Sequence, residues 1–393
     1  MSTLAGERCF RRAGGGAMKV RTLMTADTVG GGWTFALELA SALSRSGSHV
    51  ELAAMGAPLT SSQRTEAGEI PRLRLHEGHF RLEWMEGCWD SVDQASAWLL
   101  DLERRVVPDV VHLNGYAHGA VSWRAPVVIT GHSCLLSRHA AVLGNAASAT
   151  WDRYAEEVAR GLRGAQVVTA PTRVMGDALR RHYGEDLSVR VIPNGRSFPI
   201  PPVVPKRHRV LTVGPLWDPA KNVAAMDRVA AKLSWPVVVA GQTRHPDGGV
   251  VRLKNARALG VLEPAALSRA YAGAAIFALP ALYEPFGYAP LEAALSGCAL
   301  VLGDIPSLRE VWGDAACYVP PRDDQALIQT VRWMIDDRQV RRDYAKRAKE
   351  RALTYTPERM AAGYLDAYRM AVAEPTELLR VPVERGTFSG VRL

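Results

Sequence analysis

The chain has 393 residues, of which 48% are hydrophobic and 22% are charged, a length and composition that predict two globular domains. No apolar stretch approaches the roughly 20 residues of a membrane span, and five scattered cysteines without a CxxC pair argue against a disulfide framework or zinc site and favour the cytoplasm. Lys and Arg exceed Asp and Glu by 48 to 40, which favours an anionic partner, but their dispersed positions argue against nucleic-acid binding.

Strand and helix patterns alternate through the first half of the chain. Residues 1–17 contain arginines with no apolar core after them, which predicts a disordered extension and not a secretory signal. A strand at 19–24, the glycine loop Gly30-Gly31-Gly32 and a helix that ends at Gly47 follow. Further strands are predicted at 49–53, 110–113, 127–129, 167–169 and 189–192, and helices at 90–105, 151–162 and 172–183. This alternation predicts a doubly wound parallel sheet over 18–198.

A proline-rich stretch separates this series from a second one. Residues 199–207 cannot continue a strand ladder and are predicted to form a stiff linker. A second α/β domain is predicted over 208–356 and a weakly structured tail over 374–393. Its strands are predicted at 209–213, 236–240, 256–261, 275–279, 299–302 and 317–319, with an Asp-capped helix from 323 and basic helices at 338–353 and 357–373.

The most informative motif contains two carboxylates, Glu284 and Glu292, with seven residues between them. They flank the junction between the strand at 275–279 and a helix, which is the edge of an open α/β sheet where ligands bind. Gly287 lets the backbone approach a ligand closely, and free N–H groups at the helix start suit an anion. Each carboxylate can accept two hydroxyls, as a sugar ring and a ribose would require.

Other polar residues are predicted at the same strand ends. Lys221 follows the first strand of the second domain and offers a positive charge to phosphate. His132 follows a buried strand and is expected to donate to a substrate hydroxyl or stabilise developing charge. No Asp-x-Asp or metal-spaced His/Asp/Glu cluster is present, which predicts that Lys221 and backbone N–H groups neutralise a departing phosphate without a metal.

Two competing sites can be set aside from the sequence. A dinucleotide fingerprint fails because the third glycine offset from Gly30 is Phe35 and no acid ends the strand at 49–53. A nucleophile–base pair between His132 and Cys134 is disfavoured because residues at i and i+2 of an extended segment point the same way without meeting.

Taken together, these residues resemble the retaining glycosyltransferases of family four, whose GT-B fold places two facing Rossmann-like domains around an interdomain cleft. The likeness spans about residues 18–372 and covers both domains. It rests on Val29-Gly30-Gly31-Gly32, Thr130-Gly131-His132-Ser133, Ala170-Pro171-Thr172, Val191-Ile192-Pro193-Asn194-Gly195, Lys221-Asn222, the Glu284 to Glu292 element and Gly303 to Val311.

The resemblance implies roles for individual residues. Glu284, His132 and Lys221 would be catalytic, Glu292 would bind the ribose, and helix 357–373 would pack back on the acceptor-binding first domain. The backbone of Phe286, Gly287 and Tyr288 would hold the donor, with Gly31, Gly32, Gly214, Asn222 and Arg309. The acceptor would meet Asp27, Asn114, Tyr116 and His118.

The resemblance also implies an activity. A hexose would move from a nucleotide diphosphate sugar, a co-substrate that replaces any cofactor, to a hydroxyl of a sugar, a lipid-linked sugar or a small molecule. Retention would follow from front-face attack with the leaving phosphate as base, or from a covalent intermediate. The protein is expected in the cytoplasm or at the inner face of the membrane, where dispersed arginines of the first domain would contact anionic lipid.

One departure from the family pattern leaves alternatives open. The family usually has Gly-Arg-Leu where this chain has Gly214-Pro215-Leu216, and the missing Arg shares the diphosphate. Its contact is worth roughly 1.5–3 kcal/mol, or about ten- to a hundredfold, unless Arg244 or Arg309 replaces it. The alternatives are a GT-B accessory protein that has lost turnover and an epimerase or phosphorylase on the same fold.

Overall fold

The computed structural model describes residues 19–199, 204–245 and 248–373. The predicted extension over 1–17, the predicted tail over 374–393 and residues 200–203 of the predicted linker lie outside the described residues.

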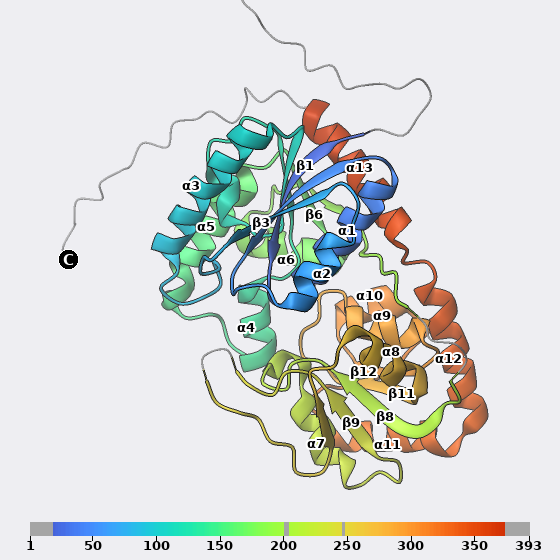
Figure 1. The fold of residues 1–393 in the computed structure, drawn as a ribbon. Helices are drawn as coiled ribbons and strands as arrows, with labels where there is room; N and C mark the ends of the chain where they lie inside the picture. The colour runs from blue at the N-terminus through green and yellow to red at the C-terminus, as the bar shows by residue number, and fades with distance from the viewer. Residues whose placement is uncertain (1–18, 200–203, 246–247, 374–393) are drawn as a thin grey trace, which may run out of the picture.

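The first domain is built on a seven-stranded parallel sheet in the order β3-β2-β1-β4-β5-β6-β7 (Figure 1). Its strands are β1 (Arg21–Asp27), β2 (His49–Met55), β3 (Leu73–Gly78), β4 (Val110–Leu113), β5 (Val127–Thr130), β6 (Val167–Ala170) and β7 (Val189–Val191). Its helices are α1 (Gly31–Arg45), α2 (Ser61–Gly68), α3 (Trp89–Val106), α4 (Leu135–Leu143), α5 (Asp152–Arg163) and α6 (Arg173–Tyr183), with short turns η1 (Ala117–Ala120) and η2 (Ala149–Trp151).

The second domain is built on a six-stranded parallel sheet in the order β10-β9-β8-β11-β12-β13. Its strands are β8 (Arg207–Val213), β9 (Val237–Ala240), β10 (Arg257–Gly260), β11 (Ala274–Leu279), β12 (Ala299–Gly303) and β13 (Cys317–Val319). The helices are η3 (Pro219–Lys221), α7 (Val223–Ala230), α8 (Pro264–Gly273), α9 (Tyr288–Leu295), α10 (Pro306–Trp312), α11 (Asp324–Asp336), α12 (Arg338–Ala352) and α13 (Pro357–Ala373).

The predicted pair of doubly wound parallel sheets is confirmed. Each strand predicted from the sequence is present, with boundaries that differ by up to three residues. The elements β3, α2, α4, α7, α8 and α10 have no counterpart among the predicted ones. β3 escapes prediction because its residues 73–78 are mostly half-buried or exposed, so the strand lacks the continuous apolar run of a central strand.

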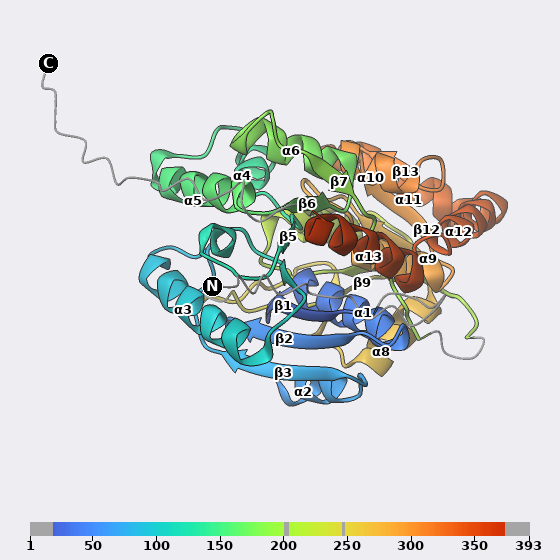
Figure 2. The same cartoon turned by 90° about the horizontal axis from the view of Figure 1, so that it is seen from above.

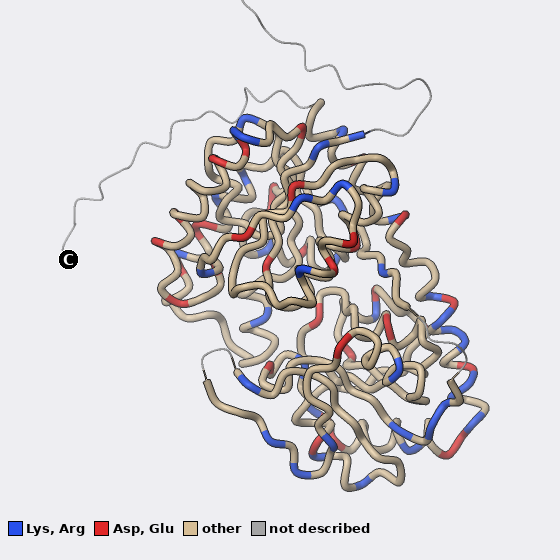
Figure 3. The backbone as a smooth tube through the Cα atoms, viewed as in Figure 1, with Lys and Arg blue, Asp and Glu red and all other residues tan. Residues whose placement is uncertain are grey.

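Each strand supplies two different cores, because successive side chains point to opposite faces of the sheet. On β1, Met24 packs with α1 and α13, whereas Leu23 packs with α3, α5 and α6. Figure 3 shows Lys and Arg spread over both domains, as the sequence predicts. No helix within the described ranges is long and apolar enough to cross a membrane.

The chain crosses between the two sheets twice, and the crossings touch. The first passes Gly195 and the second passes Thr356, just before α13. A Cβ atom at position 195 would lie 2.2 Å from the carbonyl oxygen of Thr356, and the Arg196 N–H donates to the Tyr355 carbonyl at 3.1 Å. Glycine is therefore required in the Pro-Asn-Gly segment because another stretch of backbone occupies the space of a side chain.

After its crossing, α13 lies on the first sheet beside α1 (Figures 1 and 2). Two of its tyrosines reach the buried strand residues. The Tyr368 hydroxyl bonds to His112 Nδ1 at 2.8 Å, and His112 Nε2 bonds to Thr130 Oγ1 at 2.7 Å. Burial lowers the pKa of His112 to about 3, so the ring is neutral at pH 7. These hydrogen bonds hold α13 on the first domain, whereas the preceding helix, α12, packs on the second domain.

We expect Tyr368→Phe to lower the free energy of unfolding by about 1–3 kcal/mol, because it leaves a buried nitrogen of His112 without its partner. Tyr364→Phe is the matched control on the same helix. Its hydroxyl bonds to Thr130 at 3.1 Å, but Thr130 keeps Thr169 at 2.8 Å, so the loss should be smaller. Urea unfolding of both variants measures the difference, and equal losses would contradict the anchoring role of His112.

Candidate active site

Two helix N-termini, one from each domain, meet where the carboxyl edges of the sheets face each other. α1 begins after Gly30 with φ of 76°, and α9 begins after Gly287 with φ of 95°. Neither helix has a side-chain cap or an acidic residue in its first turn, so their first N–H groups are available to a ligand. A Cβ atom at Gly31 would lie 3.7 Å from Tyr288, the first residue of α9. This arrangement suits an anion between the domains.

The ion pair of Lys221 and Glu284 lies at this edge. Lys221 Nζ is 2.6 Å from Glu284 Oε2, with side chains that are 23% and 11% exposed. Burial pulls the pKa of Lys221 down, but the Glu284 carboxylate outweighs it and the pKa is raised, so the ammonium stays charged. Next to it, Asn222 has φ of 54° and donates to the carbonyls of Pro280 at 2.9 Å and Pro321 at 2.7 Å. Asn222 thus joins the loops around the pair.

The backbone of the predicted donor loop is tightly packed around Gly287. A Cβ atom at this position would lie 3.2 Å from Glu284 Cγ and 3.1 Å from Pro290 Cγ, and its φ is in the left-handed region. The Phe286 side chain is buried in the core of the second domain and meets Tyr355 edge-on at 5.4 Å. Only the backbone of Phe286 is therefore offered to a ligand, whereas Tyr288 packs against cores of both domains.

Glu292 is held by a residue that the sequence analysis does not single out. Its Oε1 accepts from Arg196 Nε at 2.7 Å, and the same guanidinium donates to Glu38 of α1 at 2.5 Å. The Ser197 N–H also donates to Glu38 at 3.1 Å. Burial raises the pKa of both carboxyls, and the Arg196 charge opposes this rise. Arg196, at the domain crossing, thus links a helix of each domain, and Glu292 keeps acceptor capacity for a hydroxyl.

His132 and Asn114 form a pair that fixes the histidine tautomer. The Asn114 amide donates to the Thr25 carbonyl at 2.6 Å, which turns its oxygen toward His132 Nε2 at 2.8 Å. Nε2 therefore carries the proton, and Nδ1 is an acceptor. Burial lowers the pKa of His132 to about 3, so the ring is neutral at pH 7. Because Asn114 takes up Nε2, the ring nitrogen left for a ligand is Nδ1, an acceptor in this tautomer.

The predicted acceptor residues divide into two groups. Asp27 ends β1 beside Gly32, and burial together with the charge of Glu83 raises its pKa to about 7. Tyr116 is buried, and its hydroxyl donates to the Ser133 carbonyl at 2.5 Å. His118 is also buried, with Nδ1 bonded to Ser96 of α3 at 2.9 Å and its pKa lowered by burial to about 4. The side chains of Tyr116 and His118 thus form one group, occupied by partners beneath the surface of the first domain. Asp27, at the end of β1, and Asn114, beside His132, form the other group, at the edge of the sheet.

The structure does not bring Arg309 to the Lys221–Glu284 pair. Its guanidinium binds Asp304 at 2.7 Å and stacks over Tyr318 at 4.4 Å, and its side chain is 54% exposed. Gly214, in contrast, lies beside Lys221, since a Cβ there would be 3.4 Å from Lys221 Cγ.

A different arginine approaches this site from the first domain. Arg138 of α4 donates to Asp218 Oδ1 at 2.6 Å, and its charge acts on Lys221 across the cleft. Asp218 in turn accepts from the Ala220 N–H at 3.0 Å and so shapes the turn that carries Lys221. No local pattern around residue 138 marks it, because its partner lies 80 residues away. Lys221 and Arg138 thus bring one positive charge from each domain to this part of the domain interface.

The chain is similar to known proteins over both of its domains. The family model described as Glycosyltransferase Family 4 matches residues 29–197, and the model described as Glycosyl transferases group 1 matches residues 207–337. A glycogen synthase of Mycobacterium tuberculosis is 29% identical over 278 residues, 64% of this chain, and the match spans 66% of that relative's length.

Two solved structures show the same fold. A sucrose-phosphate synthase from Thermosynechococcus elongatus superposes with a TM-score of 0.73 at 18% identity, over 89% of this chain and 98% of that one. Anabaena HepE in complex with UDP-glucose superposes with a TM-score of 0.69 at 16% identity, over 89% and 99% of the two chains.

We expect Arg196→Met to destabilise the protein by about 3–5 kcal/mol, because Glu38 and Glu292 lose their buried cation. Without Arg196 the pKa of these carboxyls is higher in the folded state than in the unfolded state. The folded state therefore loses stability as pH rises, and the destabilisation caused by the substitution should grow between pH 5 and pH 8. Arg228→Met, which breaks an ion pair with Asp324 whose side chains are 54% and 34% exposed, is the control and should cost less than about 1 kcal/mol. Urea unfolding at both pH values tests this, and a loss independent of pH would contradict it.

Proposed function

Because the chain belongs to the family-four glycosyltransferases with a GT-B fold, we propose that it transfers a sugar from a nucleotide diphosphate sugar to an acceptor hydroxyl. The observation that carries this proposal is the buried Lys221–Glu284 pair beside the uncapped N-terminus of α9. Such a site offers a cation and backbone N–H groups to a diphosphate, and carboxylate oxygens to sugar hydroxyls.

In this proposal the diphosphate of the donor lies against the N-termini of α1 and α9. Lys221 and Arg138 neutralise the phosphates from opposite domains, while Glu292 accepts a ribose hydroxyl beside Arg196. His132 Nδ1 accepts a hydrogen bond from a hydroxyl of the transferred sugar. The HepE complex, which contains UDP-glucose, supports a nucleotide sugar as the donor.

We further propose that transfer retains the anomeric configuration and needs no metal ion. The bond between the anomeric carbon and the β-phosphate oxygen breaks, and the acceptor oxygen forms the new bond on the same face. The acceptor proton passes to the departing phosphate oxygen. Negative charge on the diphosphate is offset by Lys221, Arg138 and the N–H groups of α9, which is electrostatic stabilisation by groups already in place.

Arg138 also bears on the accessory-protein alternative. That alternative rests on Pro215, which replaces an arginine of the usual family pattern. Arg138 lies within electrostatic reach of Lys221 and restores a second cation to the cleft. We therefore favour an enzyme with turnover over a binding protein.

A titration with UDP-, GDP- and ADP-sugars, followed by thermal shift or calorimetry, tests the donor. The anomeric configuration of the product, measured by NMR, tests retention, and activity in excess EDTA tests independence from metals. If no nucleotide sugar binds, the proposed function is wrong. An inverted product would leave transfer standing but overturn retention.

Substitution of the two cations should separate their roles. We expect Arg138→Ala to lower kcat by about ten- to a hundredfold, because one charge-assisted contact to the leaving diphosphate is lost. Lys221→Ala should cost about a hundred- to a thousandfold, since it also leaves Glu284 unpaired. The control is Arg180→Ala on α6, whose charge pairs locally with Asp177. Steady-state kinetics with a fixed acceptor measures all three, and an Arg138→Ala enzyme as fast as the control would remove Arg138 from the mechanism.

A further inference from the structure

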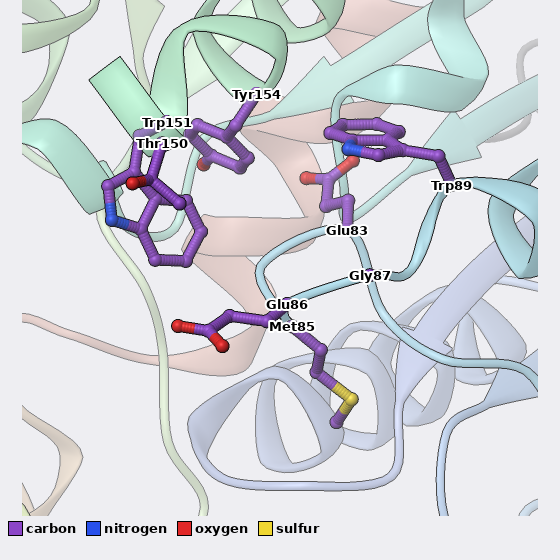
Figure 4. Close-up of a pocket in the computed structure, with 8 residues that line it drawn as sticks. All are labelled: Glu83, Met85, Glu86, Gly87, Trp89, Thr150, Trp151 and Tyr154. Carbon is purple, nitrogen blue, oxygen red and sulfur yellow. The ribbon is translucent and has the colours of Figure 1, made fainter. Parts of the chain in front are cut away.

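A separate pocket opens in the first domain near Asp27. Its cavity is about 290 Å³. Figure 4 shows that the β3–α3 loop forms one side and the start of α5 the other. The lining residues are Glu83, Met85, Glu86, Gly87, Trp89, Thr150, Trp151 and Tyr154.

Hydrogen bonds and packing hold the walls of this pocket in place. The Glu83 carboxylate accepts from the backbone N–H groups of Tyr116 at 3.0 Å and Ala117 at 2.7 Å, which fixes the β3–α3 loop against the turn after β4. Trp89 packs in a small core around Cys88. On the other wall, Trp151 meets Tyr154 edge-on at 6.1 Å. The pocket is thus a preformed feature of the fold.

The pocket lies beside the predicted acceptor end of the active site. The β3–α3 loop and the start of α5 are both at the carboxyl edge of the first sheet, as is Asp27 at the end of β1. Glu83 acts on the Asp27 carboxyl through its charge, and Trp84 Nε1 lies 3.4 Å from Asp27 Oδ2. An acceptor whose reacting hydroxyl lies near Asp27 can therefore extend its remaining part into this pocket.

The chemistry of the lining restricts what can bind. Trp151 and Tyr154 supply aromatic surfaces, Glu83 and Glu86 supply carboxylates, and the lining contains no Lys, Arg or His. The third aromatic residue, Trp89, is covered by the guanidinium of Arg153 at 4.9 Å. The Glu86 side chain is exposed and has no hydrogen-bond or ion-pair partner within the described ranges. Flat aromatic faces with a few polar groups suit the apolar face and hydroxyls of a sugar ring. Two carboxylates repel a phosphate and attract an amine.

From this lining we propose that the pocket is an acceptor subsite for a single sugar ring without negative charge, either neutral or amine-bearing. The inference rests on the proposed function. The volume lies at the low end of ligand pockets, about 300–1,000 Å³, which fits one ring and not a longer oligosaccharide.

The test is calorimetry or saturation-transfer NMR on the full chain with UDP present and three probes: methyl glucoside, glucosamine and glucose 6-phosphate. We expect glucosamine to bind at least as tightly as methyl glucoside, and glucose 6-phosphate to bind about tenfold more weakly. Glu86→Lys should reverse the order of glucosamine and glucose 6-phosphate, and Trp151→Ala should weaken all three about five- to thirtyfold.

Glu69→Lys is the matched control, because Glu69 is exposed at the end of α2, outside the pocket lining, and the change in net charge is the same. Its probe affinities should equal those of the unaltered protein. Circular dichroism checks that Trp151→Ala is folded. Because Glu86 is exposed, Glu86→Lys should fold normally and tests the pocket even if Trp151→Ala does not fold. The proposal is overturned if glucose 6-phosphate binds as tightly as glucosamine, or if both pocket variants bind all probes like the control.

Failure of the proposed function gives a different result. Repeating the titrations with Lys221→Ala in the absence of nucleotide separates the two sites, because the pocket contains no residue of the Lys221–Glu284 pair. Sugar binding that responds to Glu86→Lys, with no nucleotide bound by any variant, would support the pocket and reject the transferase. If nucleotide binds but the sugar affinities are the same in the pocket variants and the unaltered protein, the transferase proposal stands and the pocket proposal is rejected.

Discussion

Charge matching between buried carboxylates and cations from distant parts of the chain is the interaction on which this cleft depends. Glu284 is matched by Lys221, whereas Glu292 and Glu38 share Arg196. Burial raises the pKa of Glu38 and Glu292, and the charge of Arg196 opposes this rise. Removal of a cation would leave a charge without compensation, which is far more costly than loss of an exposed ion pair. The site is therefore also a structural joint between the domains.

The loop that carries Glu284 is held by the opposite domain as well as by its own. The hydroxyl of Tyr283, its neighbour, accepts from the Cys134 N–H at 2.8 Å, and the Pro285 carbonyl accepts from Thr172 at 3.1 Å. Nearby, Glu310 of α10 accepts from the first N–H groups of α6 at 2.7 and 3.0 Å. Closure of the domains thus positions the donor loop. A change in domain angle would therefore also displace the loop that carries Glu284.

The residues proposed to meet the acceptor lie at two depths in the first domain. Tyr116 and His118 lie beneath the surface and hold backbone and helix partners, while Asp27 and Asn114 remain at the edge of the sheet. Glu83 belongs to the same framework, because its carboxylate binds the N–H group of Tyr116. The shape of the pocket near Asp27 consequently depends on buried polar residues that never need to touch an acceptor.

Local patterns in the sequence determined the two parallel sheets and marked Glu284, Glu292, Lys221 and His132 as candidate site residues, because strand period, helix start and glycine position are properties of neighbouring residues. The pairing of Arg138 with Asp218, 80 residues apart, and of Arg196 with Glu38, 158 residues apart, was decided only by tertiary structure. So were the internal partners of His118, the tautomer of His132 and the exposed edge strand β3. Each depends on which groups folding brings within about 3 Å, and side-chain periodicity along the chain carries no such information.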